Sequence, residues 1–129
     1  MKKTYVIYHS NCSDGFLSAY LFRIAFPHAE FIPAKYGDAL PEIESGSRVF
    51  IADFSYDRET LIELSKRCEL TVLDHHKTAQ ENCKGLDFCI FDMDKCGARL
   101  SIEYLIENNL LRRIVVVKYG QLTPLTQLN

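Results

Sequence analysis

Five short runs rich in β-branched and aromatic residues alternate with segments of helical periodicity, and this alternation most constrains the fold. The predicted strands are residues 4–9, 29–34, 48–54, 69–76 and 86–94. Helical patterns cover residues 16–26, 55–68 and 95–109, and residues 77–85 form a short helix or a loop. Strands joined by crossovers of about ten or more residues are typical of parallel pairing. The sequence therefore predicts an α/β fold with a five-stranded, mainly parallel sheet and helices on both faces.

Local signals refine this arrangement. Pro33 weakens the second strand because it cannot donate to a ladder, so we expect that strand at the edge of the sheet. Ser55 or Asp57 is expected to cap the helix that follows the third strand. Residues 10–15, "SNCSDG", read as a polar turn.

The composition of the chain limits the classes of function that it can have. The 129 residues, 47% of them hydrophobic, suffice for a single domain, which we expect to span 1–129. The formal charge of -2 predicts no basic face for nucleic acid and leaves the partner open. No apolar run reaches the roughly 18 residues of a membrane span, and the N-terminus does not resemble a signal peptide, so we expect a cytoplasmic protein. The five cysteines are an odd number without zinc-site spacing, which favours reduced thiols.

Polar residues of metal-binding type follow the predicted strands at their carboxyl ends. In an open α/β sheet these ends share one edge, where ligands bind. Imidazole and carboxylate together suit Mn, Fe, Co or Zn, and several carboxylates favour a two-metal centre. A lone aspartate after a strand is usually a helix cap or a turn residue, but Asp or His at four strand ends together favours the ligand interpretation. Asp94 is expected to cap the helix after it. The residues in question are His9, Asp14, Asp53, Asp74, His75, His76, Asp92 and Asp94.

Four segments together resemble a known family. "HSNCSDGFLSA", "IADFSY", "VLDHHKTA" and "DMDKCGARLSIEYL" look like the successive motifs of the DHH phosphoesterase superfamily, in the family's order, over residues 4–107. The superfamily includes nucleases, oligoribonucleases, cyclic-dinucleotide phosphodiesterases, exopolyphosphatases and manganese-dependent pyrophosphatases. The sequences of these segments are most similar to those of its short phage-type or exopolyphosphatase-related branch. The resemblance implies a metal-dependent phosphohydrolase that cleaves a phosphodiester or phosphoanhydride in a nucleotide, a short oligonucleotide or polyphosphate.

The resemblance also implies individual roles. His9 would bind the first metal, Asp14 and His75 the second, and Asp53 would bridge both. Asp74 would orient His75, His76 would face the substrate phosphate, and Asp53, Asp74 and His76 would form the catalytic set. The metal is expected to be Mn²⁺, with Mg²⁺ or Co²⁺ as alternatives, two per site. The backbone of Cys96, Gly97 and Ala98 would approach an anion, although small residues there equally serve close packing.

The sequence departs from the family pattern at two places. Cys12 stands where the family has the first aspartate of its Asp-x-Asp motif, and reads as a thiolate ligand or as a small partly buried thiol. Asp92 stays undecided between ligand and turn residue. Residues 108–129 contain no acidic residue where the family has another metal-binding aspartate, so we expect an atypical tail without the family's C-terminal substrate domain.

These departures leave three hypotheses open. The chain is an active phosphohydrolase on a phosphorylated small molecule or short nucleic acid, a phosphate-binding or nucleotide-binding module without catalysis, or an inactive homologue. The apolar segment "RRIVVVKY" (112–119) would expose a hydrophobic patch, which predicts a homodimer.

Overall fold

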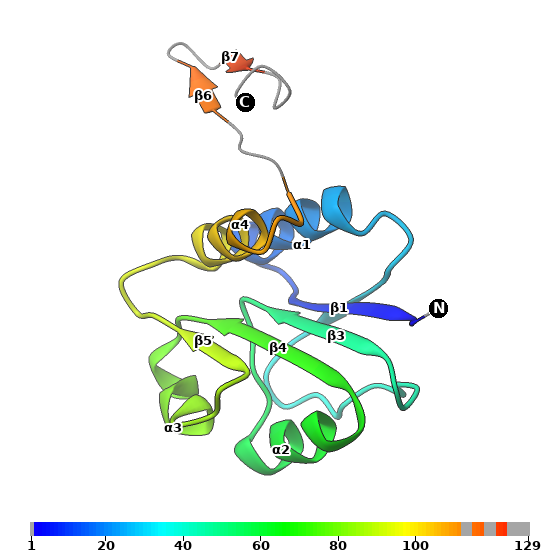
Figure 1. Cartoon of the computed structure of the whole chain (residues 1–129). Helices are drawn as coiled ribbons and strands as arrows, with labels where there is room; N and C mark the ends of the chain where they lie inside the picture. Colours follow the sequence, from blue (N-terminus) through cyan, green and yellow to red (C-terminus); the bar gives the residue numbers. More distant parts are fainter. Residues whose placement is uncertain (1, 112–114, 118–120, 124–129) are drawn as a thin grey trace.

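A computed structural model describes residues 2–111, 115–117 and 121–123. The elements are β1 (Thr4–His9), α1 (Ser13–Ala25), β2 (Glu30–Ala34), β3 (Arg48–Ala52), α2 (Arg58–Arg67), β4 (Glu69–Asp74), the 3₁₀ helix η1 (Lys77–Ala79), α3 (Gln80–Cys83), β5 (Cys89–Phe91), α4 (Gly97–Glu107), β6 (Val115–Val117) and β7 (Gln121–Thr123). From β1 to α4 the chain follows the predicted order of strands and helices, and two short strands that were not predicted come after α4 (Figure 1).

Strands β1 to β5 form one sheet in the order β2-β1-β3-β4-β5, and every pair in it is parallel. Helices α1 and α4 lie on one face of this sheet, and α2 and α3 lie on the other (Figure 1). The structure confirms the predicted α/β fold with helices on both faces. It also confirms that β2, which contains Pro33, is an edge strand.

Successive strand residues point into two different cores. In β3, Val49 and Ile51 face the core under α2, whereas Phe50 and Ala52 face the core under α1 and α4. All four are at most 2% exposed. Burial on both faces explains why the central strands read as nearly continuous apolar runs rather than as an alternating pattern.

The sheet order places a topological switch between β1 and β3. From β1 the chain crosses to β2 on one side, and the next strand, β3, pairs with β1 on its other side. Connections that diverge from neighbouring strands leave a crevice at their carboxyl ends, which is where open α/β sheets bind ligands. His9 ends β1 and Asp53 follows β3, so both flank this crevice.

Several element boundaries differ from the predicted ones. Helix α1 begins at Ser13, inside the expected polar turn, so Asp14 lies in the first helical turn instead of a preceding loop. Strand β3 ends at Ala52, because Asp53 adopts a left-handed backbone conformation with φ of 59°. Strand β4 ends at Asp74, before the two histidines, and β5 has only 3 residues.

Of the two predicted helix caps, the structure confirms one and shows that the other is wrong. Asp57 caps α2, since its carboxylate accepts a hydrogen bond from the Thr60 N–H at 2.8 Å. Asp94 does not cap α4, because the helix begins later and Cys96 occupies the N-cap position without a side-chain bond. The α4 N-terminus is instead capped by Asp14, a residue of α1.

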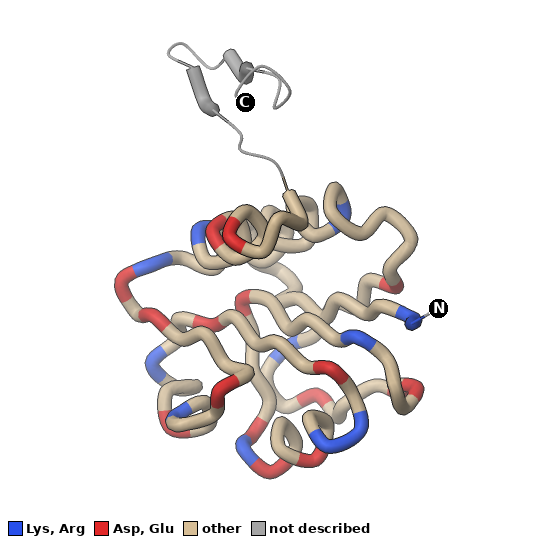
Figure 2. The backbone as a smooth tube through the Cα atoms, viewed as in Figure 1, with Lys and Arg blue, Asp and Glu red and all other residues tan. Residues whose placement is uncertain are grey.

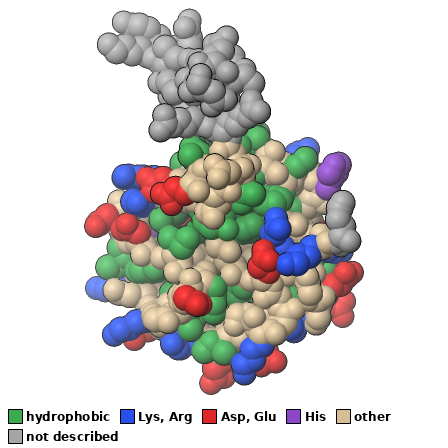
Figure 3. All heavy atoms as spheres, viewed as in Figure 1, with side chains coloured by type: hydrophobic (Ala, Val, Ile, Leu, Met, Phe, Trp, Pro, Cys, Tyr) green, Lys and Arg blue, Asp and Glu red, His purple; other side chains and the backbone are tan. Residues whose placement is uncertain are grey.

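Charged side chains of both signs are intermixed along the chain (Figure 2), and the face in Figure 3 carries them without a broad patch of one sign. Strands β6 and β7 pair antiparallel in a separate ladder. The side chains of residues 112–119, on which the homodimer prediction rests, lie outside the described part of the structure. Within that part, no helix combines the length and the apolar character needed to cross a membrane.

Candidate metal centre

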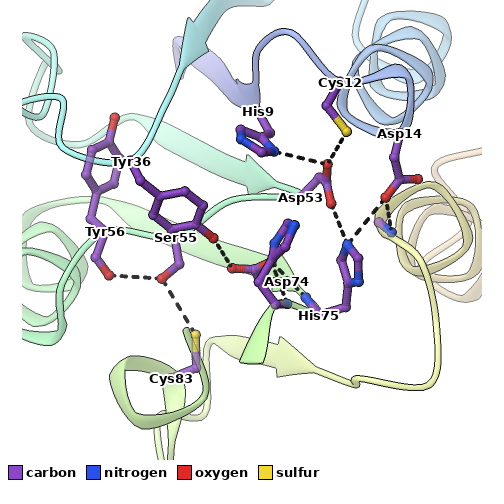
Figure 4. A network of polar contacts seen from close by, with 12 residues as sticks. His9, Cys12, Asp14, Tyr36, Asp53, Ser55, Tyr56, Asp74, His75 and Cys83 are labelled. Atoms are coloured by element: carbon purple, nitrogen blue, oxygen red, sulfur yellow. Dashed lines mark hydrogen bonds and ion pairs between the residues drawn. The ribbon is translucent and has the colours of Figure 1, made fainter. Parts of the chain in front are cut away.

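The Asp53 carboxylate lies at the middle of a cluster of polar side chains (Figure 4). Its side chain is 0% exposed, and its backbone N–H donates to the Leu73 carbonyl at 2.8 Å. Oδ1 is 2.7 Å from His75 Nε2, and Oδ2 is 3.6 Å from His9 Nδ1. The left-handed backbone at Asp53 turns the chain out of the sheet here, which aspartate tolerates better than most residues do. The two carboxylate oxygens therefore face one histidine at the end of β1 and one that directly follows β4.

One possible ligand group lies at the end of β1. His9, Cys12 and Asp53 offer a ring nitrogen, a thiol sulfur and a carboxylate oxygen that all lie within 4.8 Å of one another. The Cys12 sulfur is 3.7 Å from Asp53 Oδ2. His9 Nδ1 is buried and has no hydrogen-bond partner in the described part of the chain. A buried polar atom of this kind is costly unless a ligand satisfies it.

A second possible ligand group lies at the end of β4. Asp53, Asp74, His75 and His76 offer ligand atoms that again lie within 4.8 Å of one another. Asp53 belongs to both groups, with one oxygen directed toward each. The geometry therefore allows two adjacent cations to share this carboxylate, and the two groups come from the ends of β1, β3 and β4.

Asp74 holds His76, not His75 as the sequence led us to expect. Its buried Oδ1 accepts hydrogen bonds from His76 Nδ1 at 2.7 Å and from the backbone N–H groups of His75 and His76 at 2.8 and 3.2 Å. Oδ2 accepts from the Tyr36 hydroxyl at 3.3 Å. The reason for the difference is that the His75 ring turns toward Asp53 and Asp14, whereas the His76 ring folds back over Asp74. Asp74 thus fixes the His76 ring and leaves its other nitrogen free to face a ligand.

Asp14 is held by backbone N–H groups. Its two oxygens accept hydrogen bonds from Gly97 at 2.7 Å and Ala98 at 2.8 Å, so Asp14 caps α4 from the neighbouring helix. In this structure the Asp14 carboxylate occupies the N–H groups of Gly97 and Ala98, so their predicted contact with a substrate anion stays a prediction. Burial acts to raise the pKa of Asp14, but the N–H groups of Ala98 and Gly97 outweigh it and hold the pKa below its ordinary value.

Asp53 has the opposite electrostatic setting. Burial raises the pKa of Asp53 above its ordinary value, and the neighbouring Asp14 charge raises it further. His75, whose Nε2 lies 2.7 Å from Asp53 and 3.4 Å from Asp14, is the nearest group able to compensate both carboxylates. Two neighbouring carboxylates, one of them fully buried, favour a cation beside them.

Gly97 allows α4 to approach Asp53 closely. A Cβ atom added at Gly97 would lie 2.5 Å from Asp53 Oδ1. Of the two alternatives for the small residues at 96–98, the structure thus provides direct support for close packing. Cys96 itself is exposed, and its side chain makes no cap hydrogen bond.

Asp92 lies outside both ligand groups. Its Oδ1 accepts from the Asp94 N–H at 2.9 Å, and its Oδ2 is 3.9 Å from Lys95 Nζ. These contacts are those of a turn residue, which was one of the two alternatives for Asp92.

Sequence reasoning missed two aromatic neighbours of the cluster. Tyr36 bonds Asp74, and its ring meets the His9 and His76 rings edge-on at centroid distances of 5.6 and 5.9 Å. Phe54 packs on Tyr36 at 4.8 Å. Phe54 directly follows Asp53 in the sequence and could have been predicted from that position. No sequence signal indicates Tyr36, which lies in the long β2–β3 connection. Burial and the Asp74 charge raise the pKa of Tyr36 well above its ordinary value, so it stays a hydrogen-bond donor.

Gly15 fixes the contact between α1 and the end of β1, and its replacement tests that contact. A Cβ atom there would lie 2.0 Å from the His9 carbonyl oxygen. We expect Gly15→Ala to shift α1, to destabilise the protein by about 1–3 kcal/mol or more, and to weaken metal binding through His9 and Asp14. The measurement is thermal unfolding with and without Mn²⁺. Ser13→Ala, at an exposed position in the same helical turn, is the matched control, and equal behaviour of the two variants would contradict the prediction.

No family model matches the sequence. The chain is 32% identical over 118 residues to an uncharacterized protein of Acanthamoeba polyphaga mimivirus, a match that covers 77% of this chain and 28% of that protein. A crystal structure of an uncharacterized protein from Helicobacter pylori G27 is similar in fold, with a TM-score of 0.71 at 16% identity, over 83% of this chain and 37% of the other. The chain thus spans well under half the length of either protein. The structural likeness supports the fold alone.

Proposed function

We propose that the chain binds two divalent cations at the Asp53 cluster and hydrolyses a phosphoester or phosphoanhydride, in the manner of the DHH phosphoesterases that its motifs resemble. The observation that carries the proposal is the position of Asp53, whose two oxygens face separate groups of imidazole and thiol or carboxylate ligands. A structural cap or turn aspartate needs no such partners.

The residues present fit a pair of cations of the manganese type. The ligand set combines imidazoles, carboxylates and one thiol, and such mixed sets suit first-row transition ions more than Mg²⁺ or Ca²⁺. His9 and Cys12 would hold one ion with Asp53, and His75 with Asp53 would hold the other. His9 Nδ1 is buried, lies 3.6 Å from Asp53 Oδ2 and has no hydrogen-bond partner among the described residues, so a metal ion there would satisfy it. We therefore expect the site to bind Mn²⁺, with Co²⁺ as an alternative ion.

The chain's own residues would then position the substrate. When bound, the two ions would lower the pKa of a water molecule and neutralise phosphoryl oxygens. His76, held at Nδ1 by Asp74, would present its other nitrogen to the substrate phosphate. The substrate class that follows is a nucleotide, a short oligonucleotide or polyphosphate.

One observation favours a second candidate function, a phosphate-binding module without catalysis. Asp14, expected as a ligand of the second ion, belongs to neither ligand group and is engaged by the N–H groups of Gly97 and Ala98. If Asp14 keeps this cap in the presence of metal, the second ion has one ligand fewer.

Isothermal titration of Mn²⁺ into metal-stripped protein, followed by phosphodiester hydrolysis in the same buffer, tests the two candidates. Two sites per chain together with turnover would support the phosphohydrolase. A single site together with phosphate binding and no turnover would support the binding module. Absence of Mn²⁺ binding at millimolar concentration would refute both metal-dependent readings.

Cys12→Ser separates the two ions in the same experiment. We expect this variant to lose affinity at the first site by about tenfold to a hundredfold and to keep the second site, because a hydroxyl is a weaker ligand than a thiolate for these ions. Cys96→Ser, at an exposed cysteine away from both groups, is the matched control. Unchanged affinity at both sites in Cys12→Ser would show that the thiol is not a ligand.

A further inference from the structure

A cavity of about 520 Å³ lies beside the metal centre, between the β2–β3 connection and the start of α2. Its volume lies within the usual range of small-molecule sites, about 300–1,000 Å³. Three aromatic residues contribute to its wall, and Phe54, which is 1% exposed, packs on both tyrosines with ring centroids 4.8 and 5.0 Å away. The residues that matter here are Tyr36, Asp38, Phe54, Tyr56, Asp57 and Asn82.

The hydroxyl of Tyr56 is a buried polar group without a partner. The residue lines the cavity and is 7% exposed, and its hydroxyl has no hydrogen-bond partner in the described part of the chain. Leaving such a group unsatisfied costs about 1–3 kcal/mol. Burial, with the Asp38 charge, raises the pKa of Tyr56 to about 12, so the group is a neutral phenol at neutral pH. Nothing in the fold explains this hydroxyl, whereas a polar ligand in the cavity would satisfy it.

The wall of the cavity disfavours an anion. Among the described residues that line it there is no lysine or arginine, and two carboxylates, Asp38 and Asp57, are present. Each uses one oxygen in a local bond, Asp38 to the Lys35 N–H and Asp57 to the Thr60 N–H. The remaining oxygens are hydrogen-bond acceptors. Flat aromatic walls with acceptors at the rim suit a planar, uncharged group that carries N–H donors, and a phosphate would be repelled.

The cavity and the metal centre share a wall. Tyr36 lines the cavity and donates to Asp74, and Phe54 directly follows Asp53. Figure 4 shows the Tyr36 hydroxyl directed at Asp74 and the Tyr56 hydroxyl turned away from the cluster. A ligand that fills the cavity therefore has one end next to the candidate metal site.

We propose that this cavity, lined by Tyr36, Phe54 and Tyr56, binds the nucleobase of a nucleotide whose phosphate lies at the metal centre. The proposal rests on the proposed phosphohydrolase function and narrows its substrate class from phosphorylated compounds in general to nucleotides. The aromatic rings stack on the base, the Tyr56 hydroxyl bonds its edge, and the carboxylates of Asp38 and Asp57 accept from its N–H groups. Inorganic polyphosphate, which has no base, would gain nothing from the cavity.

Binding of adenosine to the metal-free protein tests the proposal independently of the metal centre. Adenosine has no phosphate, so its binding does not require the ions. We expect saturable binding of adenosine, seen by calorimetry and by NMR shifts of the tyrosine rings, and none of ribose at the same concentrations. If adenosine binds and Mn²⁺ does not, the base site stands and the phosphohydrolase proposal fails. If Mn²⁺ binds and adenosine behaves like ribose, the base site alone is refuted.

The Tyr56→Phe variant locates the site. Removal of the unpartnered hydroxyl should leave the Tm of the free protein unchanged or raise it, and should weaken adenosine binding about fivefold to tenfold. A purely structural role of Tyr56 would not combine an unchanged or raised Tm with weaker adenosine binding. Tyr20→Phe, at an exposed position on α1, is the control and should change neither quantity. Adenosine affinity that is equal in both variants and the wild type would overturn the proposal.

Discussion

Asp53→Asn is expected to abolish binding of the proposed metal pair and, at the same time, to raise the stability of the metal-free protein. The Asp53 carboxylate is 0% exposed, and another carboxylate, Asp14, lies beside it. Without cations the ionised side chain is a buried charge with incomplete compensation, which is destabilising. Asparagine has the same shape, tolerates the left-handed backbone with φ of 59°, and still offers an oxygen to His75.

The pH dependence of this effect follows from the pKa of Asp53. That pKa is raised above its ordinary value of 3.8, so the carboxyl favours folding at low pH, where it is protonated, and this contribution is lost as pH rises through the folded-state pKa. The advantage of Asp53→Asn should therefore be absent near pH 3 and present at neutral pH, as a rise in Tm of about a few degrees.

Saturating Mn²⁺ should reverse the order of stability. A ligand at about a hundred times its Kd stabilises the folded state by about 2.7 kcal/mol, and the wild type should show a gain of this size that Asp53→Asn lacks. Hydrolysis should fall by more than about a hundredfold, since even residues behind the ligands of metal sites have effects of that size. Asp94→Asn, at an exposed position, is the matched control for charge removal. A metal-free Asp53→Asn protein less stable than the wild type would contradict the argument.

The sequence predicts the fold well because the relevant signals are local and numerous. The apolar runs of β1, β3 and β4 are buried on both faces, and this burial is what makes them readable as parallel strands. Pro33 predicts its edge position through the missing N–H. The ends of elements were predicted less well, because they depend on single tertiary contacts. Strand β3 ends where Asp53 turns to meet His75, and α1 begins early because Gly15 packs on His9.

The sequence predicted which strand ends meet at the cluster, but not how the side chains of the cluster pair. The carboxyl edge of a parallel sheet brings His9, Asp53 and the Asp74–His76 segment together whatever the side chains do, so topology alone predicts the cluster. Which histidine bonds Asp74, and whether Asp14 faces an ion or a helix N-terminus, depends on side-chain directions that no sequence pattern encodes. Tyr36 lies in a connection without periodicity and Tyr56 lies just before α2, so their convergence on one cavity is visible only in three dimensions.

Asp74→Ala should have the opposite effect on stability from Asp53→Asn. Asp74 is also 0% exposed, but its oxygens accept hydrogen bonds from His76 Nδ1, from the Tyr36 hydroxyl and from two backbone N–H groups. Alanine leaves all these donors without their acceptor, and breaking a buried, paired charge in this way costs about 3–5 kcal/mol. Thermal unfolding of the metal-free protein should show a Tm lower by about 10 °C or more.

Asp74→Asn divides this effect into hydrogen bonding and charge. An amide keeps one oxygen for His76 and the backbone, and its N–H₂ group can donate to the Tyr36 hydroxyl, so we expect this variant to retain most of the stability that alanine loses. His76 would lose the carboxylate that holds its Nδ1, so hydrolysis should still fall by about tenfold to a hundredfold. Stable protein with low activity in Asp74→Asn, against unstable protein in Asp74→Ala, would establish that the Asp74 carboxylate serves the site by positioning His76. Full activity in Asp74→Asn would leave Asp74 a structural residue and remove His76 from the proposed phosphate contact.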